Sequence, residues 1–139
     1  MVAAGCLLLL LDQWSKRAVE SRVRGRRVCA GPGVRIRYVA TSRDVYRRAG
    51  GRTALTLGWT AALLSAIVLH HGGIWFQSPV ALIGLGLALG GAAGNLLDVL
   101  RARHVIDFID LRWWPVFNLA DMGIVAGLML ALVPSLGPA

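Results

Sequence analysis

The sequence predicts an all-α membrane protein with four transmembrane helices and a small β element. Hydrophobic residues make up 56% of the 139 residues, and the mean hydropathy is +0.62, which is too apolar for an ordinary soluble domain. Long apolar stretches alternate with polar connections, as expected of helices that cross a bilayer. One longer polar stretch contains a strand-like alternation. A chain of this length forms one domain.

The chain is basic, with 15 Lys and Arg against 7 Asp and Glu and a formal net charge of +8. Such a charge can indicate nucleic-acid binding, but in so apolar a chain it is better matched to anionic lipid headgroups. We therefore expect membrane lipids as partners and no nucleic acid.

The predicted spans, within one integral membrane domain of residues 1–139, are about 2–19, 54–70, 80–98 and 116–133. The apolar run that opens the first span is too short to cross a bilayer, so its helix must continue through Asp12 and Lys16. These side chains are four residues apart with the acid first, the favourable order for a helical ion pair. A pair that only neutralises its own charges and a pair with a direct role both fit this spacing.

The polar insertion covers about residues 20–52 and contains the predicted β element. Residues 34–38 alternate strictly between apolar and basic side chains, which places Val34, Ile36 and Tyr38 on one face of a strand. Gly and Pro at residues 31–33 predict a turn before it, with residues 28–30 as the partner strand. We expect a small sheet lying over the helices.

The second and third spans carry polar or small residues that need an interpretation. His70 and His71 follow the second span without a nearby carboxylate or cysteine, so we expect solvated loop histidines and no metal or cofactor. In the third span, Gly86, Gly90 and Gly94 recur every four residues. This spacing predicts a face that another helix backbone approaches closely.

Two acids stand out in residues 94–121, which hold four of the seven acidic residues. Asp107 is a lone acid in an apolar setting, and Asp121 lies at the start of the fourth span. Ionisable groups beside a membrane core are candidates for function. Two carboxylates brought together there could not both ionise easily, which is the arrangement that an aspartic protease uses to activate water.

The motifs around these acids resemble those of the lipoprotein signal peptidase family, also called signal peptidase II. The resemblance covers nearly the whole chain and rests on four blocks in the family's order: residues 12–16 (DQWSK), 94–98 (GNLLD), 105–108 (VIDF) and 117–121 (FNLAD). It implies an aspartic endopeptidase that removes the signal peptide from a diacylglyceryl-modified prolipoprotein, just before the lipid-bearing cysteine. It also implies a multi-pass protein of the cell (inner) membrane, whose β element and active site lie on the extracytoplasmic face.

The resemblance assigns the catalytic role to Asp107 and Asp121. The dipole of the fourth helix favours an ionised Asp121, so we expect Asp121 to act as the base on water and Asp107 as the protonated partner, with the roles exchanging during the cycle. Without the resemblance, a pair of interfacial acids that balance nearby arginines is an equal interpretation. Asp110 is expected to face water. The expected substrate-binding or supporting residues are Asp12, Lys16, Asn95, Asp98, Asn118, Thr41 and Arg43.

The sequence also departs from the family's pattern. Thr41 and Arg43 stand where the family usually has asparagine and glycine, and Val99 stands where it has arginine. These positions concern substrate handling, so two alternatives stay open. One is an inactive or divergent paralogue that binds lipidated ligands, and the other is a small transporter that uses the intramembrane acids.

The distribution of basic residues bears on orientation. Twelve of the 15 Lys and Arg lie in residues 16–52 and three in residues 101–112, and four spans place both segments on one side. The positive-inside rule predicts that this side is cytoplasmic. The resemblance implies the opposite, and we follow it because four ordered motifs are more specific than a charge count.

Overall fold

A computed structural model describes residues 1–24, 27–31, 33–41, 51–73 and 77–132 of the chain. The elements, in chain order, are the helix α1 (Val2–Val23), the strands β1 (Arg27–Gly31) and β2 (Val34–Thr41), the helices α3 (Gly51–His71) and α4 (Pro79–Ala102), the strand β3 (Val105–Asp110) and the helix α5 (Leu119–Leu132). The protein is therefore mostly helical with one small sheet, as the sequence predicted.

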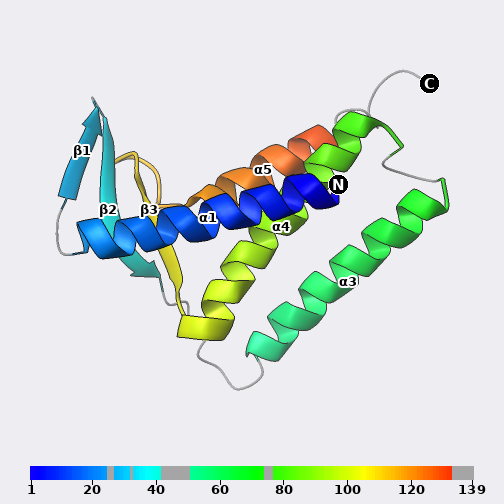
Figure 1. The fold of residues 1–139 in the computed structure, drawn as a ribbon, viewed down its shortest axis with the longest axis horizontal. Coiled ribbons are helices and arrows are strands. Elements are labelled where there is room, and N and C mark those ends of the chain that lie inside the picture. The colour runs from blue at the N-terminus through cyan, green and yellow to red at the C-terminus, as the bar shows by residue number, and fades with distance from the viewer. Residues whose placement is uncertain (25–26, 32, 42–50, 74–76, 133–139) are drawn as a thin grey trace.

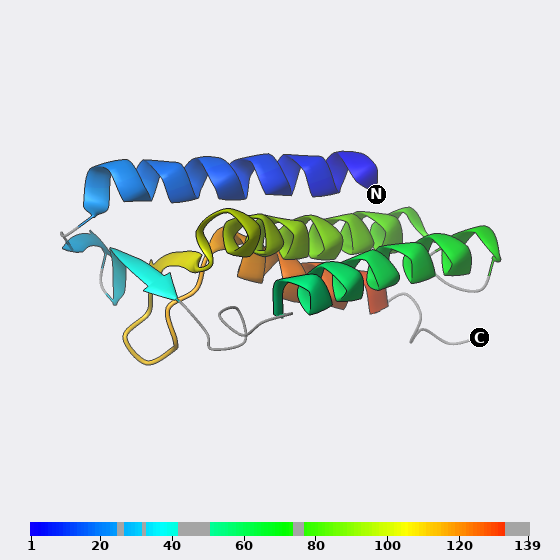
Figure 2. The ribbon, with the colours of Figure 1, turned by 90° about the horizontal axis from the view of Figure 1, so that it is seen from below.

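The helices form an elongated bundle with α4 at its centre, and the sheet lies at one end (Figure 1). Helix α4 contacts α1, α3 and α5. Figure 2 shows α1 on one side of α4, with α3 and α5 toward the other. The C-terminal ends of α1 and α4 and the first residue of α5 lie near the sheet, so three elements converge there (Figure 1).

Glycines allow α1 and α4 to approach closely. A Cβ added at Gly90 would collide with the backbone of Gly5, and one added at Gly86 would collide with the backbone of Met1. The glycine repeat of the third predicted span is thus a helix-packing surface, as expected. Helices α4 and α5 use the same device, since Gly84 and Gly127 each pack against the other helix's backbone.

The sheet has three antiparallel strands in the order β1-β2-β3. The hairpin of β1 and β2 was predicted, but β3 was not, because its six residues carry acids at two positions and lack the regular alternation of a half-buried strand. Buried Val19 and Val23 of α1 pack against Phe108 of β3, and Ile36 and Tyr38 of β2 join this cluster. The sheet is thereby fixed to the end of α1.

Among the residues that the structure describes, two helices are long and apolar enough to cross a membrane: α3, over Thr53–His71, and α4. Helix α1 has sufficient length, at 22 residues, but carries several charges, and α5 has 14 residues, about 21 Å of helix. One expectation is corrected here. His70 and His71 form the last turn of α3 rather than a loop, because the helix continues through them. Helix α5 lies within the fourth predicted span of about 116–133.

Candidate active site

Asp107 and Asp121 are brought together by the connection between β3 and α5. Phe117 forms an isolated antiparallel bridge with Ile109, and its amide donates to the Ile109 carbonyl over 3.1 Å. The chain therefore leaves β3, turns, and returns to it just before α5 starts. This places the first turn of α5, with Asp121, beside the strand residue Asp107.

Asn118 and Asp121 cap the start of α5 reciprocally. The Asn118 side-chain Oδ1 accepts a hydrogen bond from the Asp121 amide over 3.0 Å, and Asp121 Oδ2 accepts one from the Asn118 amide over 3.2 Å. This is a capping box in which Asp replaces the usual Glu or Gln. These two hydrogen bonds make Asn118, which is fully buried, the N-cap of α5. The helix therefore starts at the next residue.

Side-chain amides connect the two acids. Asn118 Nδ2 donates to Asp107 Oδ1 over 2.8 Å, and Asn95 Nδ2 donates to Asp121 Oδ1 over 2.8 Å. Asn118 Nδ2 also donates to Asn95 Oδ1 over 3.0 Å. The four residues, from α4, β3 and the start of α5, form one continuous hydrogen-bonded network.

Thr41, the last residue of β2, extends this network. Its hydroxyl lies 2.5 Å from Asp107 Oδ2. Burial raises the pKa of the Asp107 carboxyl above its ordinary value, and the nearby Asp121 adds to this, while hydrogen bonds from Thr41 and Asn118 and the charge of Lys16 act in the opposite direction. The net rise favours a protonated Asp107 at higher pH than is usual for an aspartic acid.

Lys16 lies behind the acids as a buried cation. Its Nζ lies 2.7 Å from Asp12 Oδ2 and 2.8 Å from Asp98 Oδ2, and it donates to Asn95 Oδ1 over 3.0 Å. The three protons of the ammonium thus have three acceptors. The predicted pair of Asp12 and Lys16 is formed, but it belongs to a larger buried cluster, in which Asp98 also pairs with Lys16.

Asp12 also reaches the last helix. Its Oδ1 accepts a hydrogen bond from the Ala120 amide over 3.0 Å, one of the free amides in the first turn of α5. Gln13, for which no role was predicted, donates to Asp98 Oδ1 over 2.9 Å and to the Gly94 carbonyl over 3.3 Å. Its place in the block of residues 12–16 was a signal, but its contacts depend on how α1 and α4 pack.

Asp110 does not face water, contrary to expectation. It is 9% exposed, lies 2.9 Å from the Arg37 guanidinium and accepts a hydrogen bond from the Arg112 amide. Its burial follows from its place on β3, which the sequence did not predict. Arg43 lies outside the described residues. Among those residues, no group of three or more His, Cys, Asp or Glu side chains is placed to hold a metal ion.

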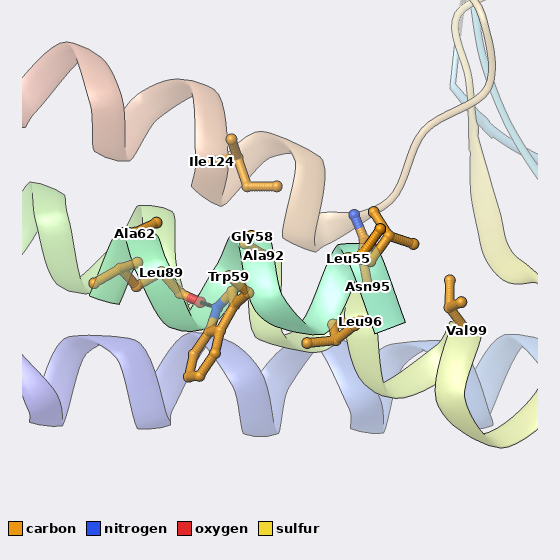
Figure 3. Close-up of a pocket in the computed structure, with 11 residues that line it drawn as sticks. Leu55, Gly58, Trp59, Ala62, Leu89, Ala92, Asn95, Leu96, Val99 and Ile124 are labelled. Atoms are coloured by element: carbon orange, nitrogen blue, oxygen red, sulfur yellow. Dashed lines mark hydrogen bonds between the residues drawn. The ribbon is translucent and has the colours of Figure 1, made fainter. Parts of the chain in front are cut away.

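Two apolar cavities flank the network. One, of about 380 Å³, lies between α3, α4 and α5 and reaches Asn95 and Val99 (Figure 3). Trp59 lines this cavity, and its indole N–H donates a hydrogen bond to the Leu89 carbonyl. The other, of about 370 Å³, runs along α5 from Asp121 to Met129. A long apolar ligand in either cavity would therefore end at the hydrogen-bonded network of the two acids.

Paired carboxylates of unequal environment are suited to general acid–base chemistry on water.

Solved structures of other proteins have the same fold. The chain is similar to two bacterial membrane enzymes, with TM-scores of 0.83 and 0.79 at 19% and 20% identity. The alignments cover 99% and 97% of this chain and 93% and 86% of those proteins. The chain thus shares the fold of these enzymes, a mostly helical bundle with a small sheet at one end.

Sequence comparison identifies the family. A family model described as signal peptidase (SPase) II matches residues 4–136. The chain is 35% identical to the lipoprotein signal peptidase of Moorella thermoacetica, over 96% of this chain and 90% of that protein. It is 36% identical to the lipoprotein signal peptidase of Pelotomaculum thermopropionicum, over 89% of this chain and 83% of that protein. The chain belongs to the signal peptidase II family, a family of peptidases.

Proposed function

We propose that this protein is an aspartic endopeptidase that removes the signal peptide from diacylglyceryl-modified prolipoproteins, with Asp107 and Asp121 as the catalytic pair. Family membership supports the substrate class. The observation that carries the mechanism is the hydrogen-bonded network that joins the two carboxyl groups through Asn95 and Asn118. Asp12, Lys16 and Asp98 support this network from α1 and α4.

The mechanism follows from the unequal surroundings of the acids. Asp121 takes a proton from water, whose oxygen attacks the carbonyl carbon of the peptide bond before the lipid-bearing cysteine. Asp107 gives its proton to the carbonyl oxygen, which yields a neutral tetrahedral diol. The proton held by Asp121 then passes to the leaving amine, Asp107 recovers a proton from the diol, and the bond breaks to an acid and an amine.

The cavities support a substrate with two apolar parts. A lipid-modified precursor carries an apolar signal segment on one side of the scissile bond and acyl chains on the other. One cavity reaches the network at Asn95 and the other at Asp121, and both are predominantly apolar. They match such a substrate better than they match a hydrated ion, which argues against the transporter alternative.

We further propose that all four helices cross the membrane. The charges of α1 are compatible with this, because Asp12 and Lys16 are 0% and 2% exposed and paired inside the bundle. The sheet and the acids then lie together at one surface, which we place on the extracytoplasmic side of the cell membrane, where exported precursors are processed.

Cleavage by the purified full chain in detergent tests the proposal. We expect a diacylglyceryl-modified prolipoprotein to be cut immediately before the modified cysteine, as identified by mass spectrometry, and the same precursor without the lipid to remain uncut. Binding of the lipidated precursor without cleavage would instead support the ligand-binding alternative. Uptake of ions or protons by proteoliposomes, without cleavage, would support the transporter.

A further inference from the structure

Thr41 occupies a defined place beside the catalytic pair. In the β2–β3 ladder, Val39 pairs with Asp107 and Thr41 pairs with Val105. Residues two apart in a strand point to the same face of the sheet, so the side chains of Thr41 and Asp107 are diagonal neighbours on that face. The separation of 2.5 Å between the Thr41 hydroxyl and Asp107 Oδ2 is short for a hydrogen bond between two oxygens.

The orientation of both amides is fixed by groups that can only donate. Asn118 Oδ1 accepts from the Asp121 backbone amide, so Asn118 Nδ2 must point toward Asp107. Asn95 Oδ1 accepts from the Lys16 ammonium, so Asn95 Nδ2 must point toward Asp121. Neither an amide NH₂ group nor a backbone N–H can accept a hydrogen bond.

Of the four carboxyl oxygens of Asp107 and Asp121, three face groups that can only donate a hydrogen bond. Asp121 Oδ1 and Oδ2 face the Asn95 side-chain amide and the Asn118 backbone amide, and Asp107 Oδ1 faces the Asn118 side-chain amide. The fourth oxygen of the pair, Asp107 Oδ2, faces the Thr41 hydroxyl, which can accept a hydrogen bond as well as donate one. Among the contacts of the described residues, it is the only oxygen of the pair with such a neighbour.

We propose that Thr41 is a positioning residue that keeps the shared proton of the catalytic pair on Oδ2 of Asp107. Before the reaction, Oδ2–H of protonated Asp107 donates to Thr41 Oγ1. Once this proton has passed to the substrate carbonyl oxygen, the hydroxyl turns and donates to the ionised Oδ2. Asp121, whose oxygens both face N–H donors, then starts the cycle as the ionised base. This inference rests on the proposed function and adds to it a residue on β2 that acts through Asp107.

The test compares three threonine variants of the full chain. Thr41→Val removes the hydroxyl but keeps the shape, and Thr41→Ser keeps the hydroxyl. Thr60→Val is a control, because Thr60 is exposed on α3 and its hydroxyl donates to the Thr56 carbonyl of the same helix. We expect Thr41→Val to lower kcat about tenfold, the effect of one lost hydrogen bond, with KM changed less than about twofold. Thr41→Ser and Thr60→Val should behave as the parent.

A second readout does not need activity. Infrared spectroscopy should show a carbonyl band of a protonated carboxyl that disappears in Asp107→Asn. We expect this band to move in Thr41→Val and to stay in place in Thr41→Ser. If Thr41→Val does not fold, Thr41→Ala, which adds no bulk, replaces it in both measurements.

The inference is overturned if Thr41→Val leaves kcat and the band unchanged, or if Thr41→Ser is as impaired as Thr41→Val, which would indicate packing by the side chain. Failure of the parent protein to cleave any lipidated precursor would reject the proposed function, whereas the infrared band would still report whether Thr41 holds the proton of Asp107.

Discussion

Asp107 and Asp121 differ in whether their hydrogen-bond partners tolerate a change to asparagine. An asparagine at position 107 could accept from the Asn118 amide through its oxygen and donate to the Thr41 hydroxyl through its nitrogen, so every polar atom would keep a partner. An asparagine at position 121 would direct its NH₂ group at another N–H, whichever way it turned. The two conservative substitutions are therefore unequal.

We predict that, at acidic pH where folded Asp107 stays protonated, Asp107→Asn keeps the stability of the parent. Asp121→Asn should lower the free energy of unfolding by about 1–3 kcal/mol, because an N–H donor such as the amide of buried Asn118 loses its acceptor. Thermal unfolding of both variants in the same detergent checks this. Glu20→Gln, which removes the charge of Glu20 from an ion pair with Arg24, is the control. Equal losses at positions 107 and 121 would show that the assigned amide orientations are wrong.

The raised pKa of Asp107 predicts a pH dependence of stability. Between the ordinary pKa of an aspartic acid and the raised value, the folded protein binds a proton that the unfolded chain has lost. The contribution of Asp107 to the free energy of unfolding is thus fully present below the unfolded pKa, falls as pH rises through this window, and is level above the folded pKa. Asp107→Asn should remove that fall, which unfolding measurements from about pH 4 to about pH 8 would detect.

Glycines set how closely the helices approach one another. We predict that Gly90→Ala destabilises the protein, because the added methyl would meet the Gly5 backbone, whereas Gly58→Ala is neutral or stabilising by up to about 1 kcal/mol, because nothing lies within 4 Å of its added Cβ. Both glycines are inside helices, so helix propensity is matched between them. Equal unfolding temperatures for the two variants would contradict close contact between α1 and α4.

Helix positions were predictable because they depend on long apolar runs, and the glycine face was predictable from its spacing. The third strand was not, because a six-residue segment becomes a strand only when β2 offers it hydrogen bonds. Asp110 was misplaced for that reason. The proximity of Asp107 and Asp121 was expected from the motifs, but the contact of Thr41 with Asp107 depends on a ladder register that the sequence does not reveal.

Orientation concerns the molecule as a whole. We predict that residues near the sheet are outside the cytoplasm, although 12 of the 15 Lys and Arg lie in residues 16–52, because a folded segment is less bound by the positive-inside rule than a short loop. In a variant without native cysteines, an impermeant reagent applied to intact cells should label Ser21→Cys, at the sheet end of α1, and spare Gln77→Cys, just before α4. The reverse pattern would place the acids in the cytoplasm and reject the proposed processing of exported precursors.

The central claim is that Asp107 and Asp121 act together in peptide-bond cleavage. The most direct measurement is the rate at which purified parent, Asp107→Asn, Asp121→Asn and Asp110→Asn proteins cut a lipid-modified prolipoprotein, each confirmed to be folded. Asp110 is the matched control, since it is a buried acid of the same strand that pairs with Arg37 outside the network. The account predicts no detectable cleavage by the variants at positions 107 and 121 and retained cleavage by the variant at position 110. Near-parental cleavage by either Asp107→Asn or Asp121→Asn would contradict it.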